Sequence, residues 1–196
     1  MSILPIYLYG TEVLRKKAKP VQKLDDAAIK LMYDLAETMH KANGIGLAAT
    51  QVGELRRMLV VDVSAIERGA RDEDEGKPPQ EEHESKVLVM INPEIKVMEG
   101  PVTMEEGCLS IPDLRAEVDR PEKIGVKYLD VNLEPAELTA DGLLARVIQH
   151  EADHLDGVMF VDRIGKTRRA LLRSELKKIE KGEVDTSYPS ISSVEV

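Results

Sequence analysis

The sequence contains few of the residues from which disulfide frameworks and base-stacking surfaces are built. It has one cysteine, Cys108, so an internal disulfide is excluded, and a lone thiol suits the reducing cytosol. One phenylalanine, five tyrosines and no tryptophan argue against an aromatic platform for nucleic-acid bases. The formal charge of −9 also argues against bulk nucleic-acid binding. DNA is therefore not an expected partner.

Long hydrophobic runs are also lacking. The longest, residues 87–91, is far too short to cross a membrane. The first residues, MSILPIY, have neither the basic start nor the apolar run of a signal peptide. A chain of 196 residues can bury its own core. We therefore expect one catalytic domain, residues 1–196, that is cytoplasmic and has no membrane partner.

The most informative segment that is present is His150-Glu151-Ala152-Asp153-His154. Two histidines four residues apart lie on one face of a helix, close enough to share a metal ion. Both continue an apolar stripe that starts at Leu143 and Val147, so both are expected to face inward. Glu151 supplies a carboxylate that can take a proton from water at such a site. The segment predicts a metal-dependent hydrolase.

A third metal ligand must come from elsewhere, because one helix offers only two. A histidine six residues after His154 is ruled out, since Phe160 stands there. Glu175 lies a suitable distance downstream, and as the third ligand it would make the protein a gluzincin-type metallopeptidase. Its neighbouring residues are strongly basic, however, which indicates a solvated helix face. Cys108 lies beside Gly107 and is the preferred candidate, although a lone cysteine is often only a small buried hydrophobe. A structural module closed by Asp153 or His83 is the other alternative.

Three motifs together resemble the peptide deformylases, which remove the formyl group from the N-terminal methionine of new bacterial proteins. They are GIGLAATQVG at residues 44–53, EGCLS at 106–110 and QHEADH at 149–154, in the family's order. The resemblance covers residues 6–179. It implies formylated nascent chains as substrates, and it implies Cys108, His150 and His154 as ligands of one divalent metal.

The resemblance also implies the identity of the metal and the catalytic groups. Fe²⁺ is the expected ion in the cell, with oxygen sensitivity, while Zn²⁺, Ni²⁺ or Co²⁺ also suit one cysteine and two histidines. Glu151 is the expected proton carrier. The side chain of Gln51 and the backbone N–H of Leu109 are expected to bind the oxyanion that forms on the formyl oxygen.

Substrate contacts are expected on both sides of the metal. Ile45, Leu143 and Val147 are candidates for an apolar pocket that accepts the methionine side chain. Extended substrate backbone is expected to pair with the segment near Gly44 and Ile45, as an added strand would. A further set at which we expect close substrate approach or contact comprises Gly46, Glu106 and Gly107.

The pattern of apolar residues predicts an α+β fold, with small antiparallel sheets around a central metal-binding helix. An N-terminal helix is expected at residues 25–43, with Ile29, Met32, Ala36 and Met39 facing the core. The metal-binding helix is expected at 141–155 and a C-terminal helix at 166–181. Strands are expected at 58–63 and 87–91, which should pair, and at 95–99, 115–119 and 124–129.

Two segments depart from a compact pattern. Residues 64–86 carry eight acids and four bases with glycine and proline, which predicts a solvated loop inserted between two strands. His83 in this loop is interpreted as a loop residue. Residues 183–196 form a serine-rich tail, either a loose terminus or an extra edge strand.

The C-terminal helix reverses the charge of the rest of the chain. Residues 163–181 contain eight basic residues and two acidic ones, which suits contact with RNA phosphates. An ordinary solvated face is the alternative. Resemblance to deformylases whose C-terminal helix contacts the ribosome favours ribosome docking of a monomeric enzyme.

Overall fold

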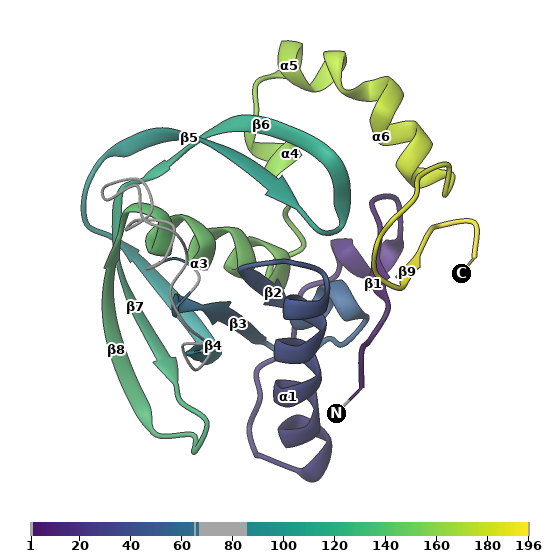
Figure 1. The fold of residues 1–196 in the computed structure, drawn as a ribbon. Coiled ribbons are helices and arrows are strands. Elements are labelled where there is room, and N and C mark those ends of the chain that lie inside the picture. The colour runs from purple at the N-terminus through teal and green to yellow at the C-terminus, as the bar shows by residue number, and fades with distance from the viewer. Residues whose placement is uncertain (1, 65, 67–85, 196) are drawn as a thin grey trace, which may run out of the picture.

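The computed structural model describes residues 2–64, 66 and 86–195 (Figure 1). Among the described elements, six strands, β3 to β8 (residues 58–141), follow one another along the chain and are succeeded by the helices α3 to α6 (residues 142–180), so the fold is α+β, as expected. The expected acidic insertion, with His83, falls almost entirely outside the described residues. No helix of the described part is long and apolar enough to cross a membrane.

A five-stranded sheet forms the centre of the molecule, in the order β2-β3-β4-β7-β8 with every pair antiparallel. Its strands are β2 (Gly46–Ala48), β3 (Met58–Asp62), β4 (Val87–Val97), β7 (Lys123–Leu129) and β8 (Pro135–Asp141). The predicted pairing of 58–63 with 87–91 is confirmed, with Met58 opposite Ile91. The predicted separate strand at 95–99 is wrong, because β4 continues through an irregularity between Ile91 and Glu94. β2 lies at one edge of the sheet.

Helix α1 (Asp26–Lys41) packs on one face of this sheet (Figure 1). Asp25 caps it, accepting a hydrogen bond from the N–H of Ala28. Asn43, and not Gly44, takes the left-handed conformation that ends it, and Gly44 N–H bonds to Met39 O.

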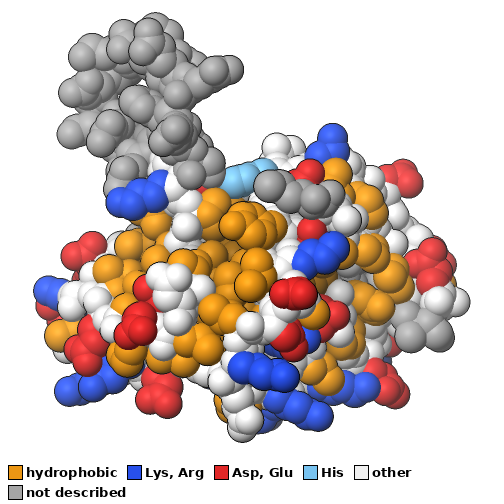
Figure 2. Space-filling view, turned by 90° about the horizontal axis from the view of Figure 1, so that it is seen from below, with side chains coloured by type: hydrophobic (Ala, Val, Ile, Leu, Met, Phe, Trp, Pro, Cys, Tyr) orange, Lys and Arg blue, Asp and Glu red, His pale blue; other side chains and the backbone are white. Residues whose placement is uncertain are grey.

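The buried face of α1 is turned from the predicted one. Met32 and Met39 are buried as expected, but Ile29 is 41% exposed. Further core contacts come from Ala28, Leu31 and Leu35, each of which immediately precedes a residue of the predicted stripe. Figure 2 shows the lower face of the molecule, where α1 lies, with a broad hydrophobic area across its middle.

Helix α3 (Gly142–Leu155) packs on the opposite face of the sheet through Ala145, Ile148 and Ala152. Its predicted boundaries are confirmed to within one residue. Gly157 ends it in the left-handed conformation, with the next N–H, that of Val158, bonding back to Asp153 O. The central helix therefore turns its other face away from the sheet.

A long hairpin covers that other face of α3 (Figure 1). Its strands, β5 (Pro101–Cys108) and β6 (Ile111–Pro121), pair in antiparallel register, and the turn at Leu109 and Ser110 joins them. The predicted strand at 115–119 is part of β6, whereas β5 was not predicted. The hairpin and α3 thus hold Cys108 above the two histidines.

The C-terminal part differs most from the expectation. The predicted helix at 166–181 is divided into α5 (Lys166–Leu171) and α6 (Arg173–Glu180), after a short α4 (Phe160–Arg163). No residue of α5 is buried, whereas Leu176 and Ile179 anchor α6 against the hairpin side. α5 thus has no anchor in the core and is held by ion pairs of Arg168 with Glu117 and of Arg169 with Asp162.

The tail returns to the start of the chain and forms an edge strand. β9 (Ser190–Ile191) pairs with β1 (Ile6–Tyr7), and this pair is parallel, unlike the antiparallel sheets expected. Two short 3-10 helices, η1 (Glu12–Arg15) and η2 (Ala49–Val52), complete the described elements named here.

Candidate active site

Three side chains able to bind a metal ion meet between β5 and α3. They are Cys108, His150 and His154, and one donor atom from each lies within 4.8 Å of the other two. Nε2 of His154 lies 3.3 Å from Nε2 of His150 and 3.2 Å from Sγ of Cys108. Tetrahedral coordination with bonds of about 2.0–2.3 Å requires donor atoms about 3.3–3.5 Å apart. The three donors therefore fit a single divalent ion.

The helix explains the placement of the two histidines. Positions 150 and 154 are one turn apart on α3, and both side chains are nearly inaccessible to solvent, at 8% and 1% exposure. The hydroxyl of Thr50 donates a hydrogen bond of 3.0 Å to the His154 carbonyl, which fixes the end of the helix against η2. Apolar contacts of α3 with the sheet hold the rest.

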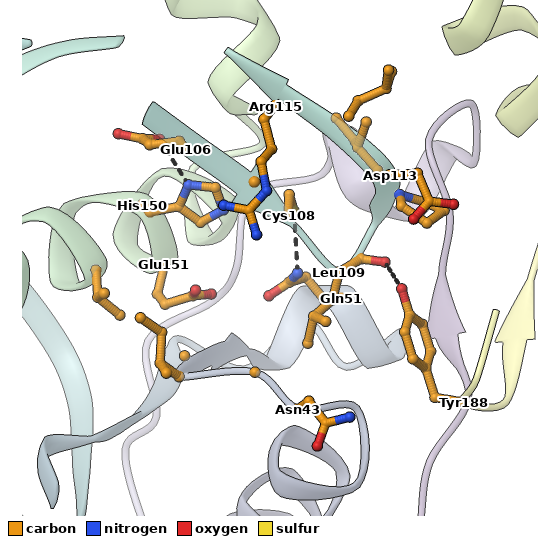
Figure 3. A pocket seen from close by; sticks show the side chains of 18 of the residues that line it. Asn43, Gln51, Glu106, Cys108, Leu109, Asp113, Arg115, His150, Glu151 and Tyr188 are labelled. Atoms are coloured by element: carbon orange, nitrogen blue, oxygen red, sulfur yellow. Dashed lines mark hydrogen bonds and ion pairs between the residues drawn. The ribbon is translucent and has the colours of Figure 1, made fainter. Parts of the chain in front are cut away.

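Glu106 orients the His150 ring. One carboxylate oxygen, Oε2, lies 2.9 Å from Nδ1 of His150, which leaves Nε2 to face the other donors (Figure 3). Arg120 donates two hydrogen bonds to this carboxylate, at 2.6 and 2.9 Å, and Arg146 donates a third at 2.8 Å. Burial opposes ionisation of Glu106, but the hydrogen bonds from His150 and Arg120 outweigh it and hold its pKa well below the usual range.

A buried ion network thus lies beside the three side chains that could bind a metal ion. Arg120 is 2% exposed and also bonds to Asp153, which in turn is paired with Arg163. Removing one member would leave a buried charge without its partner. Glu106, expected among the substrate contacts, has its carboxylate engaged in this network. Arg120 and Arg146 were not predicted as part of the site. The sequence did contain one signal for Arg146, because a charged residue one turn before His150 lies on the inward face of the helix and needs a buried partner.

The pKa values of the two histidines are shifted in opposite directions. Burial lowers the pKa of His150, but hydrogen bonds to Cys108 and Glu106 outweigh it and raise the value to about 10. Burial, together with the nearby His150, lowers the pKa of His154 well below its usual value. Metal binding requires unprotonated ring nitrogens, so a divalent ion at this site would displace the proton from His150.

Glu151 lies beside the three candidate ligands and is not part of that donor group. Its Oε2 is buried and has no hydrogen-bond partner among the described residues. Burial raises its pKa to about 7, although the nearby His150 acts in the opposite direction. A carboxylate with a pKa near neutrality can both accept and return a proton.

Gln51 brings an amide donor to the same place. Its Oε1 accepts a hydrogen bond of 2.8 Å from Ala48 N–H, which fixes the side chain. Its Nε2 lies 3.2 Å from Oγ of Ser110 and 3.7 Å from Sγ of Cys108. The backbone N–H of Leu109 donates to no acceptor within the described part of the chain. Two donors therefore lie next to the Cys108 sulfur.

A cavity of about 560 Å³ opens beside these groups. Every substrate residue expected from the sequence lines it: Gly44, Ile45, Gly46, Glu106, Gly107, Leu143 and Val147. So do Gln51, Cys108, Leu109, His150 and Glu151. Leu143 is 40% exposed, at the open side. The wall also includes residues that were not expected, among them Arg115 and the tail residues 185–188 (Figure 3).

Packing explains why two of the three glycines that line the cavity cannot carry a side chain. A Cβ on Gly46 would lie 2.6 Å from Oε1 of Glu151 and 2.7 Å from Val147, and a Cβ on Gly44 would lie 2.8 Å from the Leu109 side chain. Both would displace neighbours. A Cβ on Gly107 would make only ordinary contacts with Arg115. Glycine at 107 is thus not required by protein packing.

The other candidate ligands lie elsewhere. Glu175 is exposed on α6 and is not part of the donor group. Asp153 is engaged by Arg120 and Arg163. His83 lies outside the described residues. A gluzincin arrangement with Glu175 as ligand is therefore wrong for this fold.

Fold and site together define a metal-dependent hydrolase with three protein donors, a neighbouring carboxylate and an accessible cavity. The family model described as polypeptide deformylase matches residues 3–170 of the chain. The chain therefore belongs to the polypeptide deformylase family. It is an enzyme that uses a metal to remove the N-formyl group from nascent proteins.

Individual relatives agree over nearly the whole length. A peptide deformylase of Salinibacter ruber is 47% identical over 191 residues, which cover 97% of this chain and 95% of the relative. The crystal structure of a peptide deformylase from Legionella pneumophila is 37% identical, with a TM-score of 0.77, and covers 93% of this chain and 98% of that one. A peptide deformylase from Ehrlichia chaffeensis, solved in complex with actinonin, is 36% identical with a TM-score of 0.78, and covers 94% and 100%.

Proposed function

We propose that Cys108, His150 and His154 hold one divalent ion and that Glu151 moves the proton during formamide hydrolysis. The observation that supports this most is the compact donor group beside a buried carboxylate oxygen that has no partner among the described residues. The adjoining cavity gives substrate access to it. A catalytic site needs such an opening, whereas a structural metal site is closed by a fourth protein ligand.

The residues then divide the chemistry among them. A divalent ion in this position would make a water molecule nucleophilic near neutral pH and polarise the formyl carbonyl. Glu151 accepts the proton of the attacking water and passes it to the departing amine nitrogen. Gln51 Nε2 and the Leu109 N–H donate hydrogen bonds to the formyl oxygen as negative charge forms on it. Gly46 leaves the space that the Glu151 carboxylate needs.

The substrate is held by a pocket and by a sheet edge. Ile45, Leu143 and Val147 belong to the apolar part of the cavity wall, which suits an unbranched methionine side chain. β2 is an edge strand, so the backbone near Gly44 and Ile45 can pair with the extended chain that follows methionine. Such pairing reads any nascent chain with little dependence on later side chains.

Fe²⁺ is the ion we propose for the cell. One thiolate and two imidazoles also suit Zn²⁺, Ni²⁺ and Co²⁺, so the donor set alone does not select iron. The family resemblance favours Fe²⁺, and it carries the expectation that air inactivates the enzyme through the metal and the Cys108 thiolate.

Metal removal should stop the reaction reversibly. We expect a chelator to abolish formate release from a short N-formylmethionyl peptide, and Fe²⁺, Ni²⁺ or Co²⁺ added without oxygen to restore it, because the ligands stay in place. Formate release and metal content are measured on the same samples. A chelated protein that contains no metal and still releases formate would contradict the proposal.

We further propose that the enzyme works in the cytoplasm as a monomer and that residues 1–196 form one domain. Every residue assigned to the site comes from one chain, so no second copy is needed to complete it. A cysteine used as a metal ligand also suits a reducing compartment.

We also propose that the basic C-terminal segment docks on the ribosome. Lys166, Arg169, Arg173 and Lys177 line one hollow of about 410 Å³ beside α5 and α6. Arg169 is paired with Asp162, and Arg168 with Glu117. In the described part of the chain, Lys166, Arg173 and Lys177 have no ion pair, which supports their availability for RNA phosphates.

Charge reversal should separate docking from catalysis. The triple variant Lys166→Glu, Arg173→Glu and Lys177→Glu is expected to bind ribosomes at least about tenfold more weakly, since three phosphate contacts become repulsive. Turnover of a short formyl peptide should not change. The control variant carries the same number of charge reversals at exposed lysines outside this segment, Lys19, Lys23 and Lys96. Equal ribosome binding by the two triple variants would refute docking through this segment.

A further inference from the structure

The tail of the chain reaches the turn that carries the Leu109 donor. The hydroxyl of Tyr188 donates a hydrogen bond of 2.7 Å to the carbonyl oxygen of Leu109, across 79 positions of sequence (Figure 3). The family model ends at residue 170, so Tyr188 lies beyond the matched region. Burial raises the pKa of Tyr188 to about 12, so its hydroxyl stays protonated and can donate at any physiological pH.

The turn at Leu109 and Ser110 is held from outside the hairpin at three points. Tyr188 binds the Leu109 carbonyl, the N–H of Tyr9 donates 2.8 Å to the Ser110 carbonyl, and Gln51 reaches the Ser110 hydroxyl. Tyr9 lies two residues after β1, and Tyr188 lies two residues before β9. The paired termini therefore brace the two residues that follow Cys108.

Tyr188 is itself firmly placed. Pro189 follows it and restricts its backbone to extended conformations. The N–H of Ile6 donates 2.9 Å to the Pro189 carbonyl, and the Thr186 hydroxyl donates 2.7 Å to the Tyr188 carbonyl. The ring packs against the core cluster between α1 and the sheet. A side chain anchored in this way can fix the orientation of a partner.

We propose that Tyr188 is a positioning residue for deformylation: by binding the Leu109 carbonyl it limits backbone movement at Leu109, so that the N–H of this residue keeps pointing at the formyl oxygen. The inference rests on the proposed role of Leu109. The Leu109 carbonyl belongs to the peptide that joins Leu109 to Ser110, whereas the Leu109 N–H belongs to the preceding peptide, which joins it to Cys108. The Tyr188 hydrogen bond fixes the first of these peptides, and so limits the rotation about Leu109 that would reorient the second. Oxyanion donors act through their fixed orientation, and small misplacements reduce the rate.

The test is Tyr188→Phe, which removes one hydroxyl and keeps the packed ring. We expect kcat to fall on the order of tenfold, less than for loss of a direct oxyanion donor, with KM changed less than about twofold. Metal content and thermal midpoint should match the wild type. Tyr33→Phe is the control, because Tyr33 is 57% exposed on α1 and does not line the cavity.

The outcomes are distinguishable. An unchanged kcat in Tyr188→Phe overturns the inference, a rise in KM alone makes Tyr188 a substrate contact instead, and a loss of metal shows that it acts through Cys108; each of these contradicts the proposal. A kcat loss with normal KM and metal supports it. Absence of turnover in the wild type, measured in the same assay, would instead refute the proposed function.

Discussion

The Glu151→Gln variant is expected to keep its metal and to lose turnover by on the order of 10²–10⁴-fold. The amide is nearly isosteric and lies outside the donor group, so Cys108, His150 and His154 remain in place. It cannot accept the proton of the attacking water. Formate release and metal stoichiometry of the purified variant measure the two parts of this expectation.

A carboxylate elsewhere provides the control. Glu37 on α1 also has a buried side-chain oxygen without a partner among the described residues, but it does not line the cavity. Glu37→Gln should therefore leave turnover unchanged. If Glu151→Gln retained more than a small fraction of wild-type turnover, Glu151 could not be the proton carrier.

Gln51→Ala is expected to lower kcat by on the order of 10²–10³-fold with a much smaller change in KM. Its amide donor matters chiefly when charge forms on the formyl oxygen, so binding of the uncharged substrate loses little. Steady-state kinetics on a short formyl peptide separate the two constants. A change in KM alone would make Gln51 a ground-state binding residue.

Loss of the Gln51 anchoring bonds to Ala48 and Ser110 could also disturb the fold, so a buried glutamine is needed as control. Gln149 donates to the carbonyls of Pro121 and Ala145 and does not line the cavity. Gln149→Ala should lose comparable hydrogen bonds while keeping kcat near the wild-type value.

The parts of the fold that could be predicted are those with strong local patterns. α3 and the pairing of β3 with β4 follow from apolar periodicity and strand-forming runs. β5 and β8 were missed because their residues alternate between exposed and half-buried positions, which gives a weak apolar signal. The pairing of β9 with β1 depends on contacts between the two ends of the chain, which no local window contains.

The site divides in the same way. The spacing of His150, Glu151 and His154 is local, and the need for a third ligand pointed to Cys108. The family resemblance also implied Cys108 and added Gln51 from a distant motif. The network of Glu106, Arg120 and Arg146 joins β5, β6 and α3, so the partners of each charge appear only in the folded chain. The contact between Tyr188 and Leu109 likewise appears only in the folded chain, because it depends on a tail whose conformation could not be predicted from the sequence.

Metal content and formate release of the Cys108→Ala variant, purified without oxygen beside the wild type, test the metal site most directly. Cys108 is the one proposed ligand that does not lie on α3, so its loss removes the third donor while the helix stays intact. We predict about one divalent ion per wild-type chain, chiefly iron, together with formate release, and neither in the variant, which should remain folded by circular dichroism. A folded Cys108→Ala variant that still binds one metal ion per chain and hydrolyses the formyl peptide would contradict this account.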